Sequence, residues 1–492
     1  MKGVDLLALL QRIQGKYRQI SAALAANLIT LAYGVVPGWL SPTLPLLRST
    51  ETTLGDVVTQ EQESWLASLP FLAAFLFSPA YSYINQRLGR KAAGYLSAAP
   101  AIVGYLLVVF GDSTTHLLIS RFVLGLCIAG VNVFVTMYVS EISEDSVRGA
   151  LGNFRGVAAG IGTICVYAVG SHLSIQHTAV VCVSFPILFL FAYAWCPESP
   201  MFLLGKGRRQ EAFDAYVRLR GDPSLAEEAM RKLEAVVHTN ETHDHNGSVL
   251  GLLSVRGTRR ALLIALTLSV AQQFSGMNVM YGYCASIFEI SRTNISPQTS
   301  SIIFGFVNLS GSLFSCFSSD LAGRRPILIC TQIVQGVCLL GLGTYLYLDR
   351  FGFDVSALGV IPIACVSLYS FCVIAGPADL LFVVMAETFR PEARGLATSV
   401  TNCTLWMLAF LSTKFFNVLV DLLEVYGCFW LFAAVSYAGA LLTFFQLPET
   451  KNRSLESILR ELNGDPPAEV EKPHLEDWRS DEFASKTRTS AG

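Results

Sequence analysis

Three amide side chains stand close together in an otherwise apolar stretch of the sequence. The segment from Gln272 to Tyr283 reads QQFSGMNVMYGY, and its amides belong to Gln272, Gln273 and Asn278. This segment lies inside a long apolar run that begins near Ala261. An amide that faced lipid would lose its hydrogen bonds at a cost of about 1 to 3 kcal/mol. We therefore expect these side chains to line a cavity and to meet a polar partner there.

A carboxylate, Asp379, lies within a second apolar run and needs a similar explanation. A charged side chain inside a membrane helix costs about 2.5 to 3.5 kcal/mol on insertion scales, and it usually marks a pathway or an ion pair. Lys414 is one candidate partner. Alternatively, a helix broken near Gly376 and Pro377 would leave the carboxylate in water beside a cavity. Both interpretations stay open at the level of the sequence.

The composition favours a membrane protein over a soluble one. Of the 492 residues, 52% are hydrophobic and only 15% are charged, and the mean hydropathy is +0.49. A net charge of −2 without a basic, aromatic-rich stretch argues against a nucleic-acid partner. The 12 cysteines lie in or beside apolar runs without a C-x-x-C pair, as small core residues do. No nucleophile, phosphate loop or metal-ligand set has the needed spacing, so we expect no enzyme, cofactor or metal.

Twelve apolar runs are long enough to cross a membrane, because a spanning helix needs about 20 residues. They cover residues 19–41, 65–84, 92–110, 118–140, 150–171, 178–196, 260–289, 300–319, 327–348, 357–386, 396–420 and 427–447. The first run has no A-x-A cleavage site, so we expect it to remain as a membrane helix. The predicted fold class is therefore an all-α integral membrane protein with twelve transmembrane helices.

Basic residues predict the orientation of these helices, since cytoplasmic loops carry more Lys and Arg than outside loops. They place both termini in the cytoplasm. Asn294 is then the one glycosylation sequon in an outside loop. The predicted parts are a cytoplasmic N-terminus at 1–18, a six-helix half at 19–196, a cytoplasmic helical insert at 197–259, a second six-helix half at 260–447 and a cytoplasmic tail at 448–492.

Three motifs recur in the same order in the two predicted halves. A GRK or GRR motif follows the second helix of each half, a Glu with an Arg-Gly pair follows the fourth, and a Pro-Glu pair follows the sixth. The copies are QRLGRK at 86–91 and DLAGRR at 320–325, Glu141 with Arg148 and Glu387 with Arg394, and Pro197 and Pro448. Such repetition indicates two homologous halves related by an axis along the membrane normal, as in parallel-repeat transporters.

The repeated charges can form a latch of ion pairs at the cytoplasmic ends of the helices. Such a latch would tie the halves together when a cavity opens outward and would part when it opens inward. The positive-inside bias alone explains the arginines but not the duplicated carboxylates. The predicted members are Arg90, Lys91, Glu141, Arg148, Asp320, Arg324, Arg325, Glu387 and Arg394.

These motifs, together with QQFSGMN, closely resemble the sugar porter family of the major facilitator superfamily over residues 20–460. The stretches YVRLRGDPSLAEE, LSTKFF and FWLFAAVSY are most similar to insect trehalose and sugar facilitators and to animal glucose facilitators. The resemblance implies twelve helices in two halves, a helical cytoplasmic insert and alternating access around a site at the midplane. It also implies a monomeric carrier in the plasma membrane, with a sugar as its partner.

The resemblance further implies a set of sugar-binding positions. Amides suit sugar hydroxyls because both groups donate and accept hydrogen bonds. The implied substrate contacts are Gln272, Gln273, Asn278, Tyr283 beside the gate, Asn308, Phe382 in the place of a usual Trp, and Trp406. Ser275 and Gly276 between the amides are typical either of a helix that unwinds over its substrate or of close helix packing.

Some positions depart from the family pattern. Gly156 stands in the place of a usual Gln, with Arg155 just before it, and Asp379 replaces a proline of helix ten. Proton-linked relatives pair an acid of helix one with an Arg that matches Arg121. Helix one of this chain has no acid between residues 20 and 40, which favours facilitated diffusion.

The sequence thus predicts a facilitative transporter that moves a hexose or a trehalose-like sugar by alternating access. One alternative is a sugar sensor that binds its ligand without transport. The other is a carrier of a different small solute, such as a polyol or an organic ion, with proton coupling through Asp379.

Overall fold

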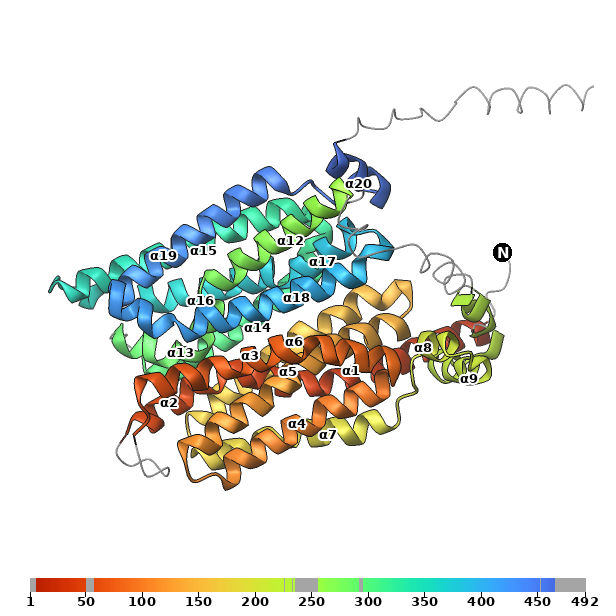
Figure 1. Ribbon diagram of the computed structural model, residues 1–492, viewed down its shortest axis with the longest axis horizontal. Helices are drawn as coiled ribbons and strands as arrows, with labels where there is room; N and C mark the ends of the chain where they lie inside the picture. The colour runs from red at the N-terminus through yellow and green to blue at the C-terminus, as the bar shows by residue number, and fades with distance from the viewer. Residues whose placement is uncertain are drawn as a thin grey trace, which may run out of the picture.

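The structure is a computed structural model, and it describes residues 6–49, 57–224, 226–231, 233–234, 255–291, 295–451 and 453–464. Long helices run side by side through this part of the chain (Figure 1). Their bounds are α1 Leu6–Gly38, α2 Leu40–Arg48, α3 Gln60–Arg87, α4 Arg90–Phe110, α5 Thr114–Ile142, α6 Asp145–Gly170, α7 Ile175–Ala194, α8 Pro200–Gly205, α9 Arg209–Arg220, α12 Arg256–Phe274, α13 Met277–Ile290, α14 Pro297–Ala322, α15 Arg324–Arg350, α16 Ile361–Val373, α17 Asp379–Thr388, α18 Pro391–Lys414, α19 Phe416–Gln446 and α20 Leu455–Asn463.

The helices divide into two groups that follow the order of the chain. In Figure 1, α1 to α7 (red to yellow) lie together, and α12 to α19 (green to blue) lie together against them. The short helices α8, α9 and α20 lie at one end of the bundle, which we call the insert end. The opposite end, with α2 and the turn between α18 and α19, is called the hairpin end.

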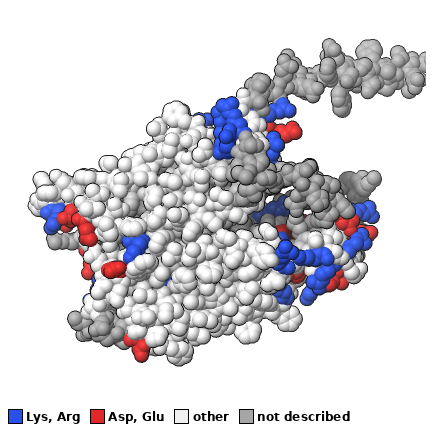
Figure 2. Space-filling model, in the orientation of Figure 1, with Lys and Arg blue, Asp and Glu red and all other residues white. Residues whose placement is uncertain are grey.

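The surface of the bundle is that of a membrane protein. Nine helices or broken helices of the described residues are long and apolar enough to span a bilayer, and α6, α14 and α18 pack in the same bundle. Phe110, Phe191 and Trp195 are 80%, 71% and 82% exposed, which suits lipid and would be a liability in water. On the face shown in Figure 2, charged residues gather toward the two ends. The all-α membrane fold is thus confirmed, whereas the count of twelve stays a prediction.

One predicted cytoplasmic segment and two predicted membrane segments differ in detail from the structure. The predicted N-terminal segment 1–18 is helical from Leu6 onward and continues directly into the first membrane helix. The run 260–289 is divided into α12 and α13, and the run 357–386 is divided into α16 and α17 around a π-helical turn, Ile374–Ala378. Apolar composition does not reveal such breaks, because a broken helix keeps the same side chains.

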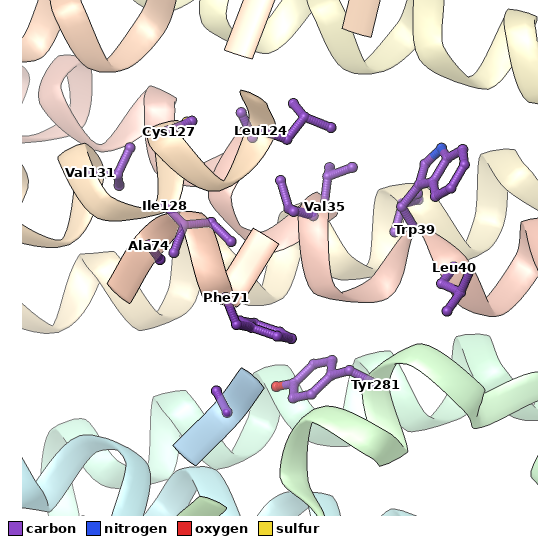
Figure 3. Packing of buried hydrophobic residues seen from close by; sticks show 14 of the residues in the cluster. Val35, Trp39, Leu40, Phe71, Ala74, Leu124, Cys127, Ile128, Val131 and Tyr281 are labelled. Atoms are coloured by element: carbon purple, nitrogen blue, oxygen red, sulfur yellow. The ribbon is translucent and has the colours of Figure 1, made fainter. Parts of the chain in front are cut away.

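Aromatic and aliphatic side chains from both groups of helices share one core. Tyr281 of α13 faces Phe71 of α3 across the boundary between the groups (Figure 3). Close by, the hydroxyl of Tyr167 on α6 donates to the Tyr281 carbonyl at 2.9 Å. The two groups therefore meet through packed side chains around the middle of the bundle.

Two prolines inside helices leave backbone carbonyls without their usual donors, and side chains of neighbouring helices supply the missing hydrogen bonds. Pro70 cannot donate to the Leu66 carbonyl, and the Arg121 guanidinium donates to that oxygen at 2.9 Å. In the same way Pro100 frees the Leu96 carbonyl, which accepts from the Tyr81 hydroxyl at 2.8 Å.

Candidate functional site

A cavity with about 890 Å³ of empty space, part of it open to solvent, lies between the two groups of helices. Its lining includes six of the seven predicted substrate contacts and Asp379. The lining residues that could bind a ligand through polar or aromatic groups are Tyr33, Phe71, Asn132, Arg155, Thr163, Gln272, Gln273, Asn278, Tyr281, Asn308, Ser312, Asp379, Phe382 and Trp406.

The break between α12 and α13 places the amides of the predicted helix seven. Gly276 has a left-handed φ of +87°, which favours glycine, and a Cβ there would lie 2.6 Å from the Phe432 ring. The Tyr369 hydroxyl donates to the Ser275 carbonyl at 2.9 Å and so satisfies a group that the break exposes. Gln272 and Gln273 precede the break and Asn278 follows it, so all three reach the cavity.

The amides differ in the hydrogen bonds that they already make. Asn278 donates through Nδ2 to Gln273 Oε1 at 2.7 Å, which orients both side chains. Asn308 donates through Nδ2 to the Tyr281 hydroxyl at 2.6 Å and to Ser370 Oγ at 3.0 Å. Gln272 Oε1 is buried and has no hydrogen-bond partner among the described residues. It can therefore accept a hydrogen bond from a ligand or from a water molecule in the cavity.

Aromatic rings form another wall of the cavity. Trp406 is stacked on Phe71, with ring centroids 6.2 Å apart and planes inclined by 8°, and Tyr33 meets it edge-on at 6.5 Å. Trp406 Nε1 is buried without an acceptor in the part of the chain that the structure describes. The wall thus offers a flat apolar face and one available N–H donor.

Asp379 reaches the cavity because helix ten is broken, as one of the two interpretations of the sequence expects. Gly376 departs from helical geometry with φ −114° and ψ −106°, and a Cβ there would lie 2.1 Å from Thr331 Oγ1. Asp379 then begins α17, where the helix dipole favours a negative charge. The pairing with Lys414 is wrong. Lys414 donates to Ser64 Oγ at 2.8 Å near the hairpin end.

Arg121 and Tyr283 are not among the residues that line the cavity. Besides its bond to the Leu66 carbonyl, the buried Arg121 donates to the Val36 carbonyl at 2.8 Å and lies over the Trp39 ring. Tyr283 packs against Phe416 at the hairpin end, with ring centroids 5.2 Å apart.

The repeated charged motifs form matching clusters at the insert end. Arg90 donates to both oxygens of Glu141 at 2.6 and 2.8 Å within the first half, and Arg324 pairs with Glu387 at 3.0 Å within the second. Arg148 donates to the carbonyls of Ser140 and Ser143. A latch that joins the two halves therefore stays a prediction.

The sequence interpretation missed one function of the repeated Pro-Glu pairs. Glu198 accepts from the backbone N–H groups of Arg90 and Lys91, each at 3.0 Å, at the start of α4. Glu449 accepts from the equivalent N–H groups at the start of α15, at 3.1 and 3.3 Å. Both glutamates thus cap a helix N-terminus. Their repetition after the sixth and twelfth predicted helices was the signal that could have revealed this.

The other predicted residues divide into those with described contacts and those without. Lys91 donates to the carbonyls of Ala194 and Cys196, and Arg325 donates to the Phe444 carbonyl at the corresponding place. Asn294 lies outside the described residues, as do the side chains of Asp320 and Arg394.

Contacts between the two groups of helices are described at the hairpin end as well as around the cavity. Gln60 of α3 donates to Asp421 of α19 at 3.3 Å, and its carbonyl accepts from Asn417 at 3.2 Å. The Ala285 N–H of α13 donates to Ser41 Oγ of α2 at 3.0 Å. In the middle of the bundle, Asn132 donates to Asn402 at 3.1 Å.

Comparisons with known proteins agree on one family. The family model described as "Sugar (and other) transporter" matches residues 23–462. The facilitated trehalose transporter Tret1 of Polypedilum vanderplanki is 30% identical over 448 residues, which are 91% of this chain and 88% of that protein. The Tret1 of Bombyx mori is 29% identical over 442 residues, 90% of this chain and 86% of that protein.

Two further comparisons set the limits of the match. The chain spans about half the length of several Drosophila relatives, for example 49% of the Tret1 of Drosophila virilis, to which it is 29% identical. Among solved structures, the proton:xylose symporter XylE bound to 6-bromo-6-deoxy-D-glucose matches with a TM-score of 0.73 at 20% identity, over 91% of this chain and 99% of that one. An inward open XylE from E. coli also matches with a TM-score of 0.73, at 19% identity over 89% and 99%.

Proposed function

The chain belongs to the sugar porter family of the major facilitator superfamily, and we propose that it moves a neutral sugar across a membrane by facilitated diffusion. A hexose and a trehalose-like disaccharide are the two substrate classes. The name of the Tret1 relatives, facilitated trehalose transporter, favours the disaccharide. Transport proceeds by alternating access of the central cavity to the two sides of the bilayer.

One observation carries the proposal. The cavity offers the acceptor Gln272 Oε1 and the donor Trp406 Nε1, both buried and without a partner among the described residues, beside the oriented pair of Gln273 and Asn278. A buried polar atom without a partner costs about 1 to 3 kcal/mol, so these groups favour a ligand that supplies hydrogen bonds of both kinds. Sugar hydroxyls do so without requiring a charge.

The surroundings of Arg121 support facilitated diffusion over proton coupling at that position. Its guanidinium is held by the carbonyls of Val36 and Leu66 and by the Trp39 ring. These partners do not titrate, and no acid lies between residues 20 and 40.

We further propose that the protein is a monomer in the plasma membrane. Both of its termini and the insert end would lie on the cytoplasmic side. The contacts between the halves at the hairpin end then favour a conformation closed to the outside.

Uptake of labelled sugars into liposomes that contain the full chain tests the proposal. We expect uptake of glucose or trehalose without a proton gradient. Gln272→Ala removes one neutral hydrogen bond and should weaken apparent affinity about two- to tenfold. Gln446→Ala is the matched control, because this exposed amide lies outside the cavity and bonds to Thr267 at 3.1 Å.

Four results would contradict the assignment in different ways. Absence of uptake for every sugar would refute transport, and binding without uptake would favour a sensor. If Gln272→Ala and Gln446→Ala had equal effects on affinity, the assignment of Gln272 to the sugar site would be wrong. Uptake that requires an inward proton gradient would replace facilitated diffusion by symport.

A further inference from the structure

Two charged side chains face the same cavity from opposite halves of the molecule. Among the described residues that line it, only Arg155 of α6 and Asp379 of α17 carry a full charge. Their formal charges cancel, so the lining as a whole is neutral. An unpaired charge in such a place would favour a ligand of the opposite sign, whereas a balanced pair does not.

The Asp379 carboxylate lies beside Gly156, where α6 of the other half has no side chain. A Cβ added at Gly156 would lie 3.6 Å from each carboxylate oxygen of Asp379 and 2.7 Å from Ser312 Oγ. The acid of the second half therefore lies within van der Waals range of a Cβ at this position of the first half, where a residue larger than glycine would first displace Ser312 Oγ.

The guanidinium crosses the cavity in the other direction. Arg155 Cζ lies 5.7 Å from the centroid of the Phe382 ring, in the first turn of α17 and three residues after Asp379. The positive charge of Arg155 is close enough to favour the ionised form of Asp379. No guanidinium nitrogen of Arg155, however, lies within 4.0 Å of an Asp379 carboxylate oxygen, so the two residues do not form an ion pair. Both groups therefore line the cavity without forming an ion pair with each other.

We infer that Arg155 and Asp379 form a charged subsite that binds hydroxyl groups of a neutral sugar and excludes charged sugars. This inference rests on the proposed function. The guanidinium donates hydrogen bonds and the carboxylate accepts them, so a pair of hydroxyl groups placed between them satisfies both. A uronic acid would bring its charge against Asp379, and an amino sugar would bring its ammonium group against Arg155.

The subsite changes which residues are expected to contribute most to sugar affinity. Hydrogen bonds to charged groups are about twice as strong as those between neutral groups. Asp379 and Arg155 would then contribute more to sugar affinity than any single amide of α12 or α13. They would also be the residues that determine selectivity, because neutral amides do not distinguish the sign of a ligand charge.

Equilibrium binding to the purified full chain tests this subsite with three probes. These are a neutral hexose, an amino sugar that is protonated at the assay pH, and a uronic acid. Wild type should prefer the neutral hexose. Asp379→Asn should weaken hexose binding about tenfold or more and shift the preference toward the uronic acid. Arg155→Gln should weaken it similarly and shift the preference toward the amino sugar.

A double variant and a matched control separate charge from folding. Arg155→Gln with Asp379→Asn should bind the hexose weakly and show no preference for either sign of charge. Asp112→Asn, which alters an exposed carboxylate in the turn between α4 and α5, should change nothing. The charge-conserving variants Arg155→Lys and Asp379→Glu should keep the exclusion of charged sugars, which shows that the site remains folded.

The possible failures are distinguishable. If wild type binds the hexose through Gln272 but the single variants leave affinity and charge preference unchanged, the subsite is refuted and the proposed function stands. A single variant that loses affinity without any shift in charge preference also refutes it, because a purely structural role would have that effect. If wild type binds no neutral sugar, the proposed function itself fails.

Discussion

Gly276 illustrates how a single residue can determine the geometry of the site. Its φ of +87° is costly for any residue with a side chain, and the Phe432 ring occupies the space that a Cβ would need. We expect Gly276→Ala to lower the free energy of unfolding by about 1 to 3 kcal/mol. A lower midpoint of thermal unfolding in detergent, together with weaker sugar binding, would show this.

Gly152→Ala is the matched control for that prediction. Gly152 lies within α6, and nothing comes within 4 Å of a Cβ built there. Alanine is the better helix former by about 1 kcal/mol, so this variant should be neutral or slightly stabilising. If both variants melted at the same temperature, the break at Gly276 would not depend on glycine.

At the scale of the helices, the notable feature is the way in which side chains compensate for prolines. Pro70 frees the Leu66 carbonyl and Arg121 bonds to it, so the proline in α3 and the buried cation depend on each other. Pro100 and Tyr81 repeat the arrangement at the Leu96 carbonyl. A buried arginine without an acidic partner is therefore explained by backbone hydrogen bonding.

This dependence predicts a non-additive pair of substitutions. Arg121→Met should destabilise the protein by about 1 to 3 kcal/mol for each carbonyl that it leaves without a donor. In a Pro70→Ala background the new N–H can bond to the Leu66 carbonyl, so the same substitution should cost less. A double-mutant cycle on thermal or denaturant stability measures the coupling, which should exceed about 0.5 kcal/mol. Additive effects would contradict the explanation.

The helices themselves were predictable, whereas their breaks and contacts were only partly so. The run 92–110 lies within α4, Arg90–Phe110, because the partition of side chains into lipid depends on composition. Gly376 and Pro377 signalled the break in helix ten. The contact of Arg155 with Phe382 and the approach of Asp379 to Gly156 were beyond reach, since they depend on how two separate helices pack.

For the whole molecule, the duplicated sequence motifs form an ion pair in each half, and the two ion pairs are not equally buried. The side chains of Arg90 and Glu141 are 8% and 9% exposed, whereas those of Arg324 and Glu387 are 12% and 27% exposed. The cost of breaking an ion pair rises with burial, because the remaining charge is harder to solvate. The first half should therefore depend more on its pair than the second half does.

This difference predicts unequal effects of the same substitution in the two halves. Glu141→Gln should destabilise the protein by about 3 kcal/mol or more, as the breaking of buried pairs does. Glu387→Gln should cost distinctly less. Thermal unfolding of the two variants in the same detergent makes the comparison, and an equal or reversed order would contradict it.

The two helix breaks beside the cavity, at Ser275–Gly276 and Gly376–Pro377, have a consequence for isotope exchange. At the first break the Gly276 N–H makes a long hydrogen bond, 3.3 Å to the Gln273 carbonyl, and α5 of the other half runs unbroken past the same cavity. Amides at such breaks exchange with deuterium earlier than those inside intact helices. Because Gln272, Asn278 and Asp379 adjoin these breaks, a bound ligand would slow deuterium uptake there. Ligand occupancy of the cavity could then be followed by mass spectrometry of the protein in detergent, where no membrane is present and transport cannot be measured.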